Sequence, residues 1–233
     1  MTSDQELLSA WRAGDRQAGS VLFDRYFDAV RRFFRNKVEH QAEDLVQRTF
    51  IGCVEGRDRF RGDASFRTYL FAIAHNILRD HLRRNRRPPE ELDLEKMSLV
   101  DLGASPTSLL AAHAEQRLLL HGLRKIPVAS QVILELYYWE RMTGPELGAF
   151  LGVPEDTARS RLRRAKQQLE DGDSRARGER GGDGEHDLRA RTMGGRAAGA
   201  AGGDALRRGR VIATVARFAR APASRAPIRG RRG

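Results

Sequence analysis

Apolar residues recur at intervals of three and four along most of residues 1–171, and this spacing constrains the fold more than any other feature. It is clearest between Ser20 and Glu39, where the recurring residues are Leu22, Phe23, Tyr26, Phe27, Val30, Phe33, Phe34 and Val38. The same spacing predicts a helix from Phe66 to Arg84. No part of residues 1–171 has the alternating β-branched pattern of a sheet, so the predicted class is all-α.

Local signals place the remaining helices. Ser3 and Glu6 have the spacing of a capping box and Gly14 suits a helix stop, which predicts a first helix of about three turns between them. The apolar pattern continues through residues 45–54, and apolar-rich helices are expected at 118–126 and 129–140.

Charge divides the chain into four parts. Residues 172–233 hold 15 Arg and six acids, a net charge of +9, so only +2 of the total of +11 belongs to residues 1–171. Residues 88–112 contain five acids, one Lys and three Pro, which is typical of a linker. We therefore predict two small helical domains, at 1–87 and 113–171, joined by an acidic linker at 88–112 and followed by a basic tail at 172–233.

The tail is rich in Arg, Gly and Ala and lacks sustained apolar periodicity, so disorder is predicted for it. Two interpretations stay open. The tail could be an auxiliary anchor for nucleic acid or a membrane surface, or it could be an unselected extension of the kind that GC-rich DNA encodes.

A helix-turn-helix is predicted at residues 143–169. Thr143 and Glu146 form a second capping box, and the break at 152–154 precedes a helix with a stripe of Ala158, Leu162, Ala165 and Leu169. Because Ser160, Arg163 and Arg164 project away from that stripe, they could contact guanine edges or phosphates in a major groove.

Several classes of protein are disfavoured. No window approaches the roughly 18 apolar residues of a membrane span, and the first residues lack the pattern of a secretory signal, so we expect a cytoplasmic protein without membrane insertion. Cys53 is the single cysteine, which excludes an intramolecular disulfide and every multi-cysteine zinc module. The histidines show no metal-ligand spacing, and no phosphate-binding loop or nucleophile motif occurs, so no metal, cofactor or enzymatic activity is predicted.

Four blocks, in this order, resemble the extracytoplasmic-function (group IV) sigma factors of the sigma-70 family of bacterial RNA polymerase. LFDRYFDAVRRFF and AEDLVQRTF resemble the start of sigma region 2 and its polymerase-binding helix. FRGDASFRTYLFAIAHNILRDHLRR is similar to the segment that opens and recognises the promoter −10 element, and the stretch from LRKIPVASQ to RRAKQQL resembles region 4. The likeness covers about residues 5–170 and implies a factor that directs promoter-specific initiation.

The resemblance also implies partners and contact residues. The partners are core RNA polymerase, promoter DNA and an anti-sigma factor. Residues matching the polymerase-binding positions are Asp44, Leu45, Gln47 and Thr49. Residues matching the −10 positions are Arg61, Gly62, Asp63, Ser65, Phe66, Tyr69, Asn76, Arg79, Arg83 and Arg84, and His75 is the one histidine placed to touch DNA. Residues matching the −35 positions are Arg159, Ser160, Arg163 and Arg164.

Alternatives remain at this point. The acids of the linker could mimic nucleic acid inside the polymerase cleft, or they could merely keep the linker solvated. A stand-alone dimeric helix-turn-helix regulator would use residues 143–169 without polymerase. A nucleic-acid-processing enzyme is disfavoured because no constellation of catalytic carboxylates or metal ligands is evident.

Overall fold

The computed structural model describes residues 2–38, 40–85, 93–102 and 114–182, and it describes side chains there except in 114–118 and 173–182. The described elements are the helices α1 (Asp4–Arg12), α2 (Arg16–Arg35), α3 (Ala42–Gly56), η1 (Arg57–Arg59), α4 (Phe66–Asn85), α5 (Ala114–Lys125), α6 (Val128–Tyr138), α7 (Gly144–Leu151) and α8 (Glu155–Gly182). Within these residues the sole β-type pairing is one isolated bridge. The all-α prediction is confirmed.

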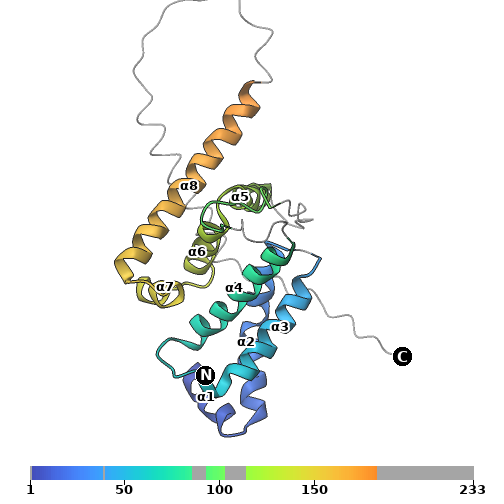
Figure 1. Cartoon of the computed structure of the whole chain (residues 1–233), viewed down its shortest axis with the longest axis vertical. Helices are drawn as coiled ribbons and strands as arrows, with labels where there is room; N and C mark the ends of the chain where they lie inside the picture. Colours follow the sequence, from blue (N-terminus) through green and yellow to red (C-terminus); the bar gives the residue numbers. More distant parts are fainter. Residues whose placement is uncertain (1, 39, 86–92, 103–113, 183–233) are drawn as a thin grey trace, which may run out of the picture.

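Helices α1 to α4 form the first domain, which occupies the lower half of Figure 1. The predicted capping box starts α1, because the Ser3 hydroxyl accepts from the Glu6 amide while the Glu6 side chain accepts from the Ser3 amide. Helix α2 begins at Arg16 and not at Ser20, since the Asp15 carboxylate accepts hydrogen bonds from two backbone amides of its first turn. It also ends at Arg35, four residues before the predicted end.

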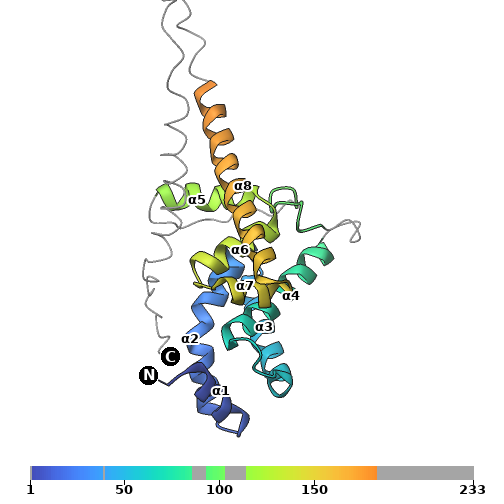
Figure 2. The same cartoon turned by 90° about the vertical axis from the view of Figure 1, so that its left-hand side faces the viewer.

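Helices α5 to α8 form the second domain, and α8 rises beyond the other helices in both views (Figures 1 and 2). The capping box of Thr143 and Glu146 starts α7 as predicted. Gly152 ends α7 in the left-handed conformation, with φ of 65°, which a residue with a Cβ rarely adopts. Glu155 then begins α8, so the predicted helix-turn-helix is present.

The last helix of the second domain extends past residue 171, the predicted end of that domain. Helix α8 continues without a break to Gly182, so residues 172–182, predicted as disordered, are helical. The remainder of the predicted tail, 183–233, lies outside the described residues. No Pro interrupts α8 after its apolar stripe has ended at Leu169, although the four Gly of residues 170–182 are poor helix formers.

Part of the predicted linker packs against the second domain. In segment 93–102, Leu99 is fully buried, and Ser98 forms the isolated bridge with Pro127. The amides of Val128 and Ala129 donate to the carbonyls of Met97 and Leu94, both at 2.9 Å. Segment 93–102 is therefore part of the fold of the second domain. The prediction that it is a solvated linker is wrong for these residues.

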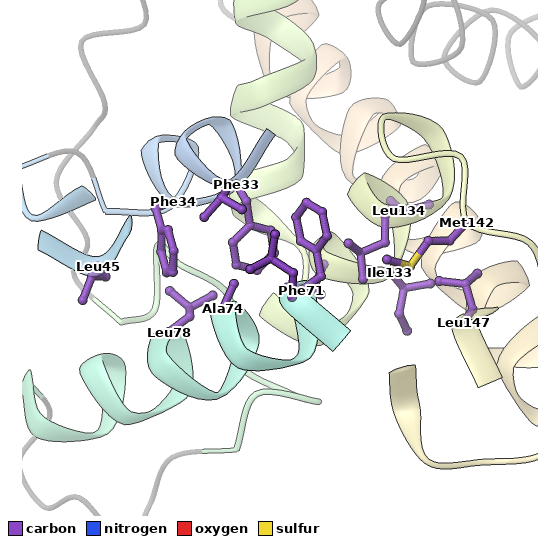
Figure 3. Close-up of a cluster of buried hydrophobic side chains, with 14 of the residues drawn as sticks. Phe33, Phe34, Leu45, Phe71, Ala74, Leu78, Ile133, Leu134, Met142 and Leu147 are labelled. Carbon is purple, nitrogen blue, oxygen red and sulfur yellow. The ribbon is translucent and has the colours of Figure 1, made fainter. Parts of the chain in front are cut away.

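The cores of the two domains are continuous. Figure 3 shows Phe33 and Phe71 of the first domain leading to Ile133 and Leu134 of the second, and all four side chains are buried. Helix α4 packs on α3 on one side and on α7 on the other. The two domains are thus in direct contact in this structure.

Candidate nucleic-acid interface

The first candidate surface is the loop at residues 61–65 with the N-terminus of α4. Arg61, Gly62 and Asp63 are exposed, and Gly62 has φ of 86°, so the loop turns at a position that favours glycine. Ser65 caps α4, because its hydroxyl accepts a 3.2 Å hydrogen bond from the Thr68 amide. The exposed loop is thereby fixed to the end of a long helix.

Two aromatic residues of this surface are less available than the sequence suggested. Phe66 is only 4% exposed and packs near Tyr26, with ring centroids 5.6 Å apart. Tyr69 is half-buried, and one face of its ring is stacked on Phe60 at 4.4 Å. In this arrangement Phe66 is a core residue, and Tyr69 can offer no more than its other face or its edge to a base.

The outer face of α4 extends the surface. Asn76, Arg79, Arg83 and Arg84 are all exposed, and the spacing of three and four residues from Asn76 to Arg83 places these side chains on one face. Arg83 also contacts Asp80 of the same helix at 3.2 Å, a pair that is exposed and therefore weak. Exposed cations on one face of a helix are the groups that commonly contact nucleic-acid phosphates.

The second candidate surface is the start of α8. Arg159, Ser160, Arg163 and Arg164 are exposed, while Ala158, Leu162 and Ala165 are buried against the preceding helices. Arg159 is paired with Glu155 at 2.5 Å, whereas neither Arg163 nor Arg164 forms an ion pair with another described residue. Arg163 and Arg164 are thus the cations best placed for a groove contact.

Two further cations in the first turns of α8, Lys166 and Arg161, contact other parts of the second domain. Lys166 lies over the rings of Tyr137 and Tyr138, 4.6 and 5.4 Å from their centroids, and its partial burial lowers its pKa. Arg161 contacts Glu95 of segment 93–102 at 3.3 Å. Of the five cations from Arg159 to Lys166, Arg163 and Arg164 are therefore the two without a side-chain partner among the described residues.

The four residues matched to polymerase binding divide into two pairs. Asp44 and Gln47 are exposed on α3. Leu45 and Thr49 have no exposed surface, and the Thr49 hydroxyl donates to the Leu45 carbonyl at 2.8 Å. A direct contact of Leu45 or Thr49 with a partner is a wrong expectation for this structure, because both side chains support α3 from inside.

An apolar groove lies beside Gln47, between α2 and α3. Phe27, Ile51 and Val54 are each more than 40% exposed although they are large and apolar. The residues that line the groove are Phe23, Asp24, Phe27, Glu43, Val46, Gln47, Phe50, Ile51 and Val54. A contiguous apolar patch with a polar rim is typical of a surface that binds another protein. The apolar spacing in the sequence had placed Phe27 and Val54 on buried helix faces.

Sequence reasoning missed the contacts between the domains. Arg67, which follows the loop, donates to the Glu146 carboxylate at 2.7 Å and to the Glu140 carbonyl at 2.6 Å. His75 is not an exposed DNA contact, because its ring packs against Phe150 of α7 at 5.3 Å between centroids. Burial, together with the positive charges of Arg79 and Lys37, lowers the pKa of His75 to about 4. Local sequence patterns cannot reveal such contacts, because the residues that pair are far apart in the chain.

Within the described ranges, no group of three or more His, Cys, Asp or Glu side chains is arranged to hold a metal ion. Among the same residues, no helix has the length and apolar character required to cross a membrane. The thiol of Cys53 is buried, and burial raises its pKa to about 12, so it is poorly reactive at neutral pH.

Comparison with known proteins gives two family matches, one to most of each domain. Residues 22–88 match sigma-70 region 2, and residues 116–169 match sigma-70 region 4. The chain belongs to the sigma-70 family, in its extracytoplasmic-function (ECF) group. Helices α1 to α4 are hereafter called region 2, and α5 to α8 with segment 93–102 are called region 4.

Individual relatives agree with this assignment. The ECF RNA polymerase sigma-E factor of Haemophilus influenzae is 27% identical over 177 residues, which span 72% of this chain and 94% of the relative. Its counterpart from Escherichia coli is also 27% identical, over 72% of this chain and 93% of the relative. Among solved structures, CnrH in complex with the cytosolic domain of CnrY has a TM-score of 0.53 and 26% identity, over 71% of this chain and 94% of that one. RpoE of Bartonella quintana, in complex with the anti-sigma factor NepR, has the same fold at a TM-score of 0.51, with 18% identity over 66% of this chain and 94% of that one.

Proposed function

We propose that this protein is an alternative sigma factor that binds core RNA polymerase and directs promoter-specific initiation of transcription by recognising −35 and −10 elements and helping to melt the promoter. The observation that carries the proposal is the presence, in one chain, of regions 2 and 4 in the order of the family, each with an exposed cationic face. It acts through recruitment, so polymerase supplies the chemistry.

Region 2 is proposed to contact the −10 element. The loop with Arg61, Gly62, Asp63 and Ser65 is exposed and is capped onto the start of α4, which suits capture of a base that has left the duplex stack. Asn76, Arg79, Arg83 and Arg84 continue the surface along α4 and would bind the backbone of the same strand.

Region 4 is proposed to contact the −35 element through the first turns of α8. Arg163 and Arg164 stand outward with Ser160, and a bidentate contact of Arg with guanine is the commonest specific contact in the major groove. Arg159 is ranked below them because Glu155 already occupies its guanidinium.

The groove between α2 and α3 is the proposed docking face for core polymerase. Exposed Phe27, Ile51 and Val54 supply apolar area, and Asp44 and Gln47 on α3 supply polar contacts at its edge. An anti-sigma factor is a further proposed partner, because the related Bartonella quintana protein was solved with one.

Transcription in vitro tests the proposal. Purified protein is combined with core polymerase and a library of genomic promoters, and the start sites are mapped. Promoter-dependent starts that require both components support the proposal. Its rejection would come from the absence of any such start, together with tight binding to a palindromic operator in the absence of polymerase. That second outcome would favour the dimeric helix-turn-helix regulator, which the match of residues 22–88 to sigma-70 region 2 disfavours.

Replacement of one groove residue tests the docking face separately. Ile51→Asp places a charge at a half-exposed apolar position on α3 and should weaken binding to core polymerase severalfold. Val100→Asp changes an equally exposed apolar residue in segment 93–102 and serves as the matched control. Equal affinities of the two variants would reject the groove as the docking face.

A further inference from the structure

Arg12, the last residue of α1, binds the segment that leads into loop 61–65. Its Nε donates to the Arg57 carbonyl at 3.2 Å, and one of its terminal nitrogens donates to the same carbonyl at 3.1 Å and to the Phe60 carbonyl. The two partners stand 45 and 48 positions further along the chain. A guanidinium can make such contacts together because its donors lie in one rigid plane. Arg12 therefore joins α1 to both ends of the short helix η1.

Arg12 also lies over the ring of Phe60. The guanidinium carbon is 5.7 Å from the centroid of that ring, within the range of a cation–π contact. The Phe60 amide donates to the Gly56 carbonyl at 3.1 Å. Because one side chain contacts both the carbonyl and the ring of Phe60, the orientation of this half-buried ring depends on Arg12.

The ring of Phe60 in turn supports Tyr69, the aromatic residue on the outer side of α4. The two rings are stacked, with centroids 4.4 Å apart and planes inclined by 21°. The Tyr69 hydroxyl lies so close to Gly56 that a Cβ added there would clash with the hydroxyl oxygen. Tyr69 is thus held at one face by Phe60 and at its hydroxyl by the backbone of α3, which fixes the face and edge that a base could meet.

Helix α1 is itself anchored in the core of region 2. Trp11, which precedes Arg12, is only 6% exposed, and its indole packs so closely on Gly19 of α2 that an added Cβ would lie 2.6 Å from the ring. The guanidinium carbon of Arg57 lies 5.3 Å from the centroid of the same indole. Arg12 therefore acts from a packed helix and not from a loose chain end.

These contacts hold loop 61–65 on the side opposite to its helix cap. Ser65 fixes the end of the loop to α4, as described above, and Arg12 fixes Phe60 directly before its start. Groups that receive an unstacked base work best when they are already in place, because ordering them on binding costs free energy. A displacement of about 1 Å in such a site can lower its efficiency about 100-fold.

We propose that Arg12 is a positioning residue for recognition of the −10 element, and that it holds the ring of Tyr69 through Phe60 in the geometry that receives an unstacked base. Arg12 acts without touching DNA, because its donors bind protein carbonyls. The proposal rests on the proposed function, which supplies the −10 element as the ligand. It extends the −10 site to α1, a helix that precedes the residues matched to sigma-70 region 2.

Discrimination between promoters tests the positioning role. A promoter that the protein starts is copied with one base changed in its −10 element or in its −35 element, and each copy competes with the parent in transcription. Arg12→Met removes every donor and should lower discrimination at −10 about tenfold while leaving discrimination at −35 unchanged. Arg16→Met removes an exposed arginine of the same region and is the matched control, which should change neither. A smaller amount of folded protein would lower all starts alike and leave both ratios unchanged.

A double-mutant cycle tests the route through Tyr69. If Arg12 acts by holding that ring, the loss of −10 discrimination in Arg12→Met with Tyr69→Ala should be clearly smaller than the product of the two separate losses. A loss equal to the product would overturn the route. If Arg12→Met does not fold, Arg12→Lys keeps the charge but not the planar set of donors, and it carries the same tests.

Hydrogen exchange in the free protein separates this proposal from the proposed function. The Phe60 amide should exchange at least about tenfold faster in Arg12→Met than in the wild type, and Arg16→Met should leave it unchanged. Unchanged exchange at Phe60, unchanged −10 discrimination, or an equal fall at −10 and −35 would each overturn the positioning role. A wild-type protein that starts no transcript with polymerase would instead reject the proposed function, and faster exchange in Arg12→Met would still show that Arg12 holds this segment.

Discussion

The side chains of Lys37 and His75 are covered by contacts with residues more than 70 positions away in the chain. Lys37 follows the end of α2, where a lysine ordinarily reaches solvent, yet it is buried beside Glu135, 98 residues away. Burial lowers the pKa of Lys37, while the charge of Glu135 raises it. His75 stands on α4 among residues that match DNA contacts, and Phe150 of α7 covers it. Neither environment follows from local sequence, because each depends on which helix packs on the other side.

The titration of His75 gives a prediction of pH dependence. In the folded protein its pKa is about 4, whereas an unfolded chain protonates histidine near 6.5. Below about pH 6.5 the unfolded chain therefore binds more protons, so the free energy of unfolding should fall, by about 2 kcal/mol at pH 5. Urea denaturation at pH 7 and pH 5 measures this fall.

His75→Leu is the control for that titration. Leucine can pack against Phe150 and takes up no proton, so the fall between pH 7 and pH 5 should be smaller in the variant by about 2 kcal/mol. His81, whose pKa is also lowered, remains in both proteins and cancels in the comparison. Identical pH dependence in the two proteins would show that His75 is solvated in the native state.

The exposed cations of α8 give a second prediction at the residue scale. Arg164→Ala should weaken initiation at promoters with a −35 element by about 1 to 3 kcal/mol if the guanidinium makes a bidentate base contact. Arg159→Ala should have a smaller effect because Glu155 holds that side chain at 2.5 Å. Competitive transcription on promoters that differ at single −35 positions measures both. An Arg164→Ala protein with unchanged promoter preference would contradict the assigned contact.

At the scale of the element, the helices could be predicted from the sequence because their signals are local. Both capping boxes join residues three positions apart, and the apolar spacing within a helix requires no knowledge of its partner. The predicted positions of helix ends were less accurate. Helix α2, for example, is capped by Asp15 and begins at Arg16, four residues before the predicted start. Segment 93–102 was missed because Pro and acidic residues around it indicate a linker, whereas the contact of Leu99 with region 4 is set by tertiary packing.

Leu99 makes the packing of that segment testable. It is the fully buried apolar residue of segment 93–102, so Leu99→Ala should lower the free energy of unfolding by about 2 to 4 kcal/mol, through lost burial and a residual cavity. Val100→Ala alters the neighbouring exposed side chain and should change stability by less than about 0.5 kcal/mol. Chemical denaturation of the two variants measures the difference, and equal stabilities would mean that the segment is not docked in solution.

At the scale of the whole molecule, the distribution of charge matters more than its sum. The total of +11 suggests a generally basic protein, yet residues 183–233 account for 12 Arg and four acids, or +8 of it. The folded part keeps two arrangements of charge. Cations lie at two exposed surfaces, and acids of one domain face cations of the other. The sequence predicted the first of these arrangements and not the second, because pairing between domains depends on their relative position.

Removal of residues 183–233 tests where specificity resides. The truncated protein keeps all of α8 and should retain the promoter preference of the full chain, while its binding to DNA of unrelated sequence becomes weaker and less dependent on salt. Transcription from a promoter library and binding measured at two salt concentrations check the two parts. A changed promoter preference would assign a specific role to the removed residues.

The docking of segment 93–102 also changes how strongly the domains are held near one another by the chain itself. While the segment is packed on region 4, residues 86–92 alone connect it to α4, and after its release the connection extends from 86 to 113. Effective concentration falls roughly as the −3/2 power of tether length, so a fourfold longer tether lowers it about eightfold. Loss of the Leu99 contact would thereby lower the effective concentration of one domain near the other, although Leu99 itself lies outside their interface.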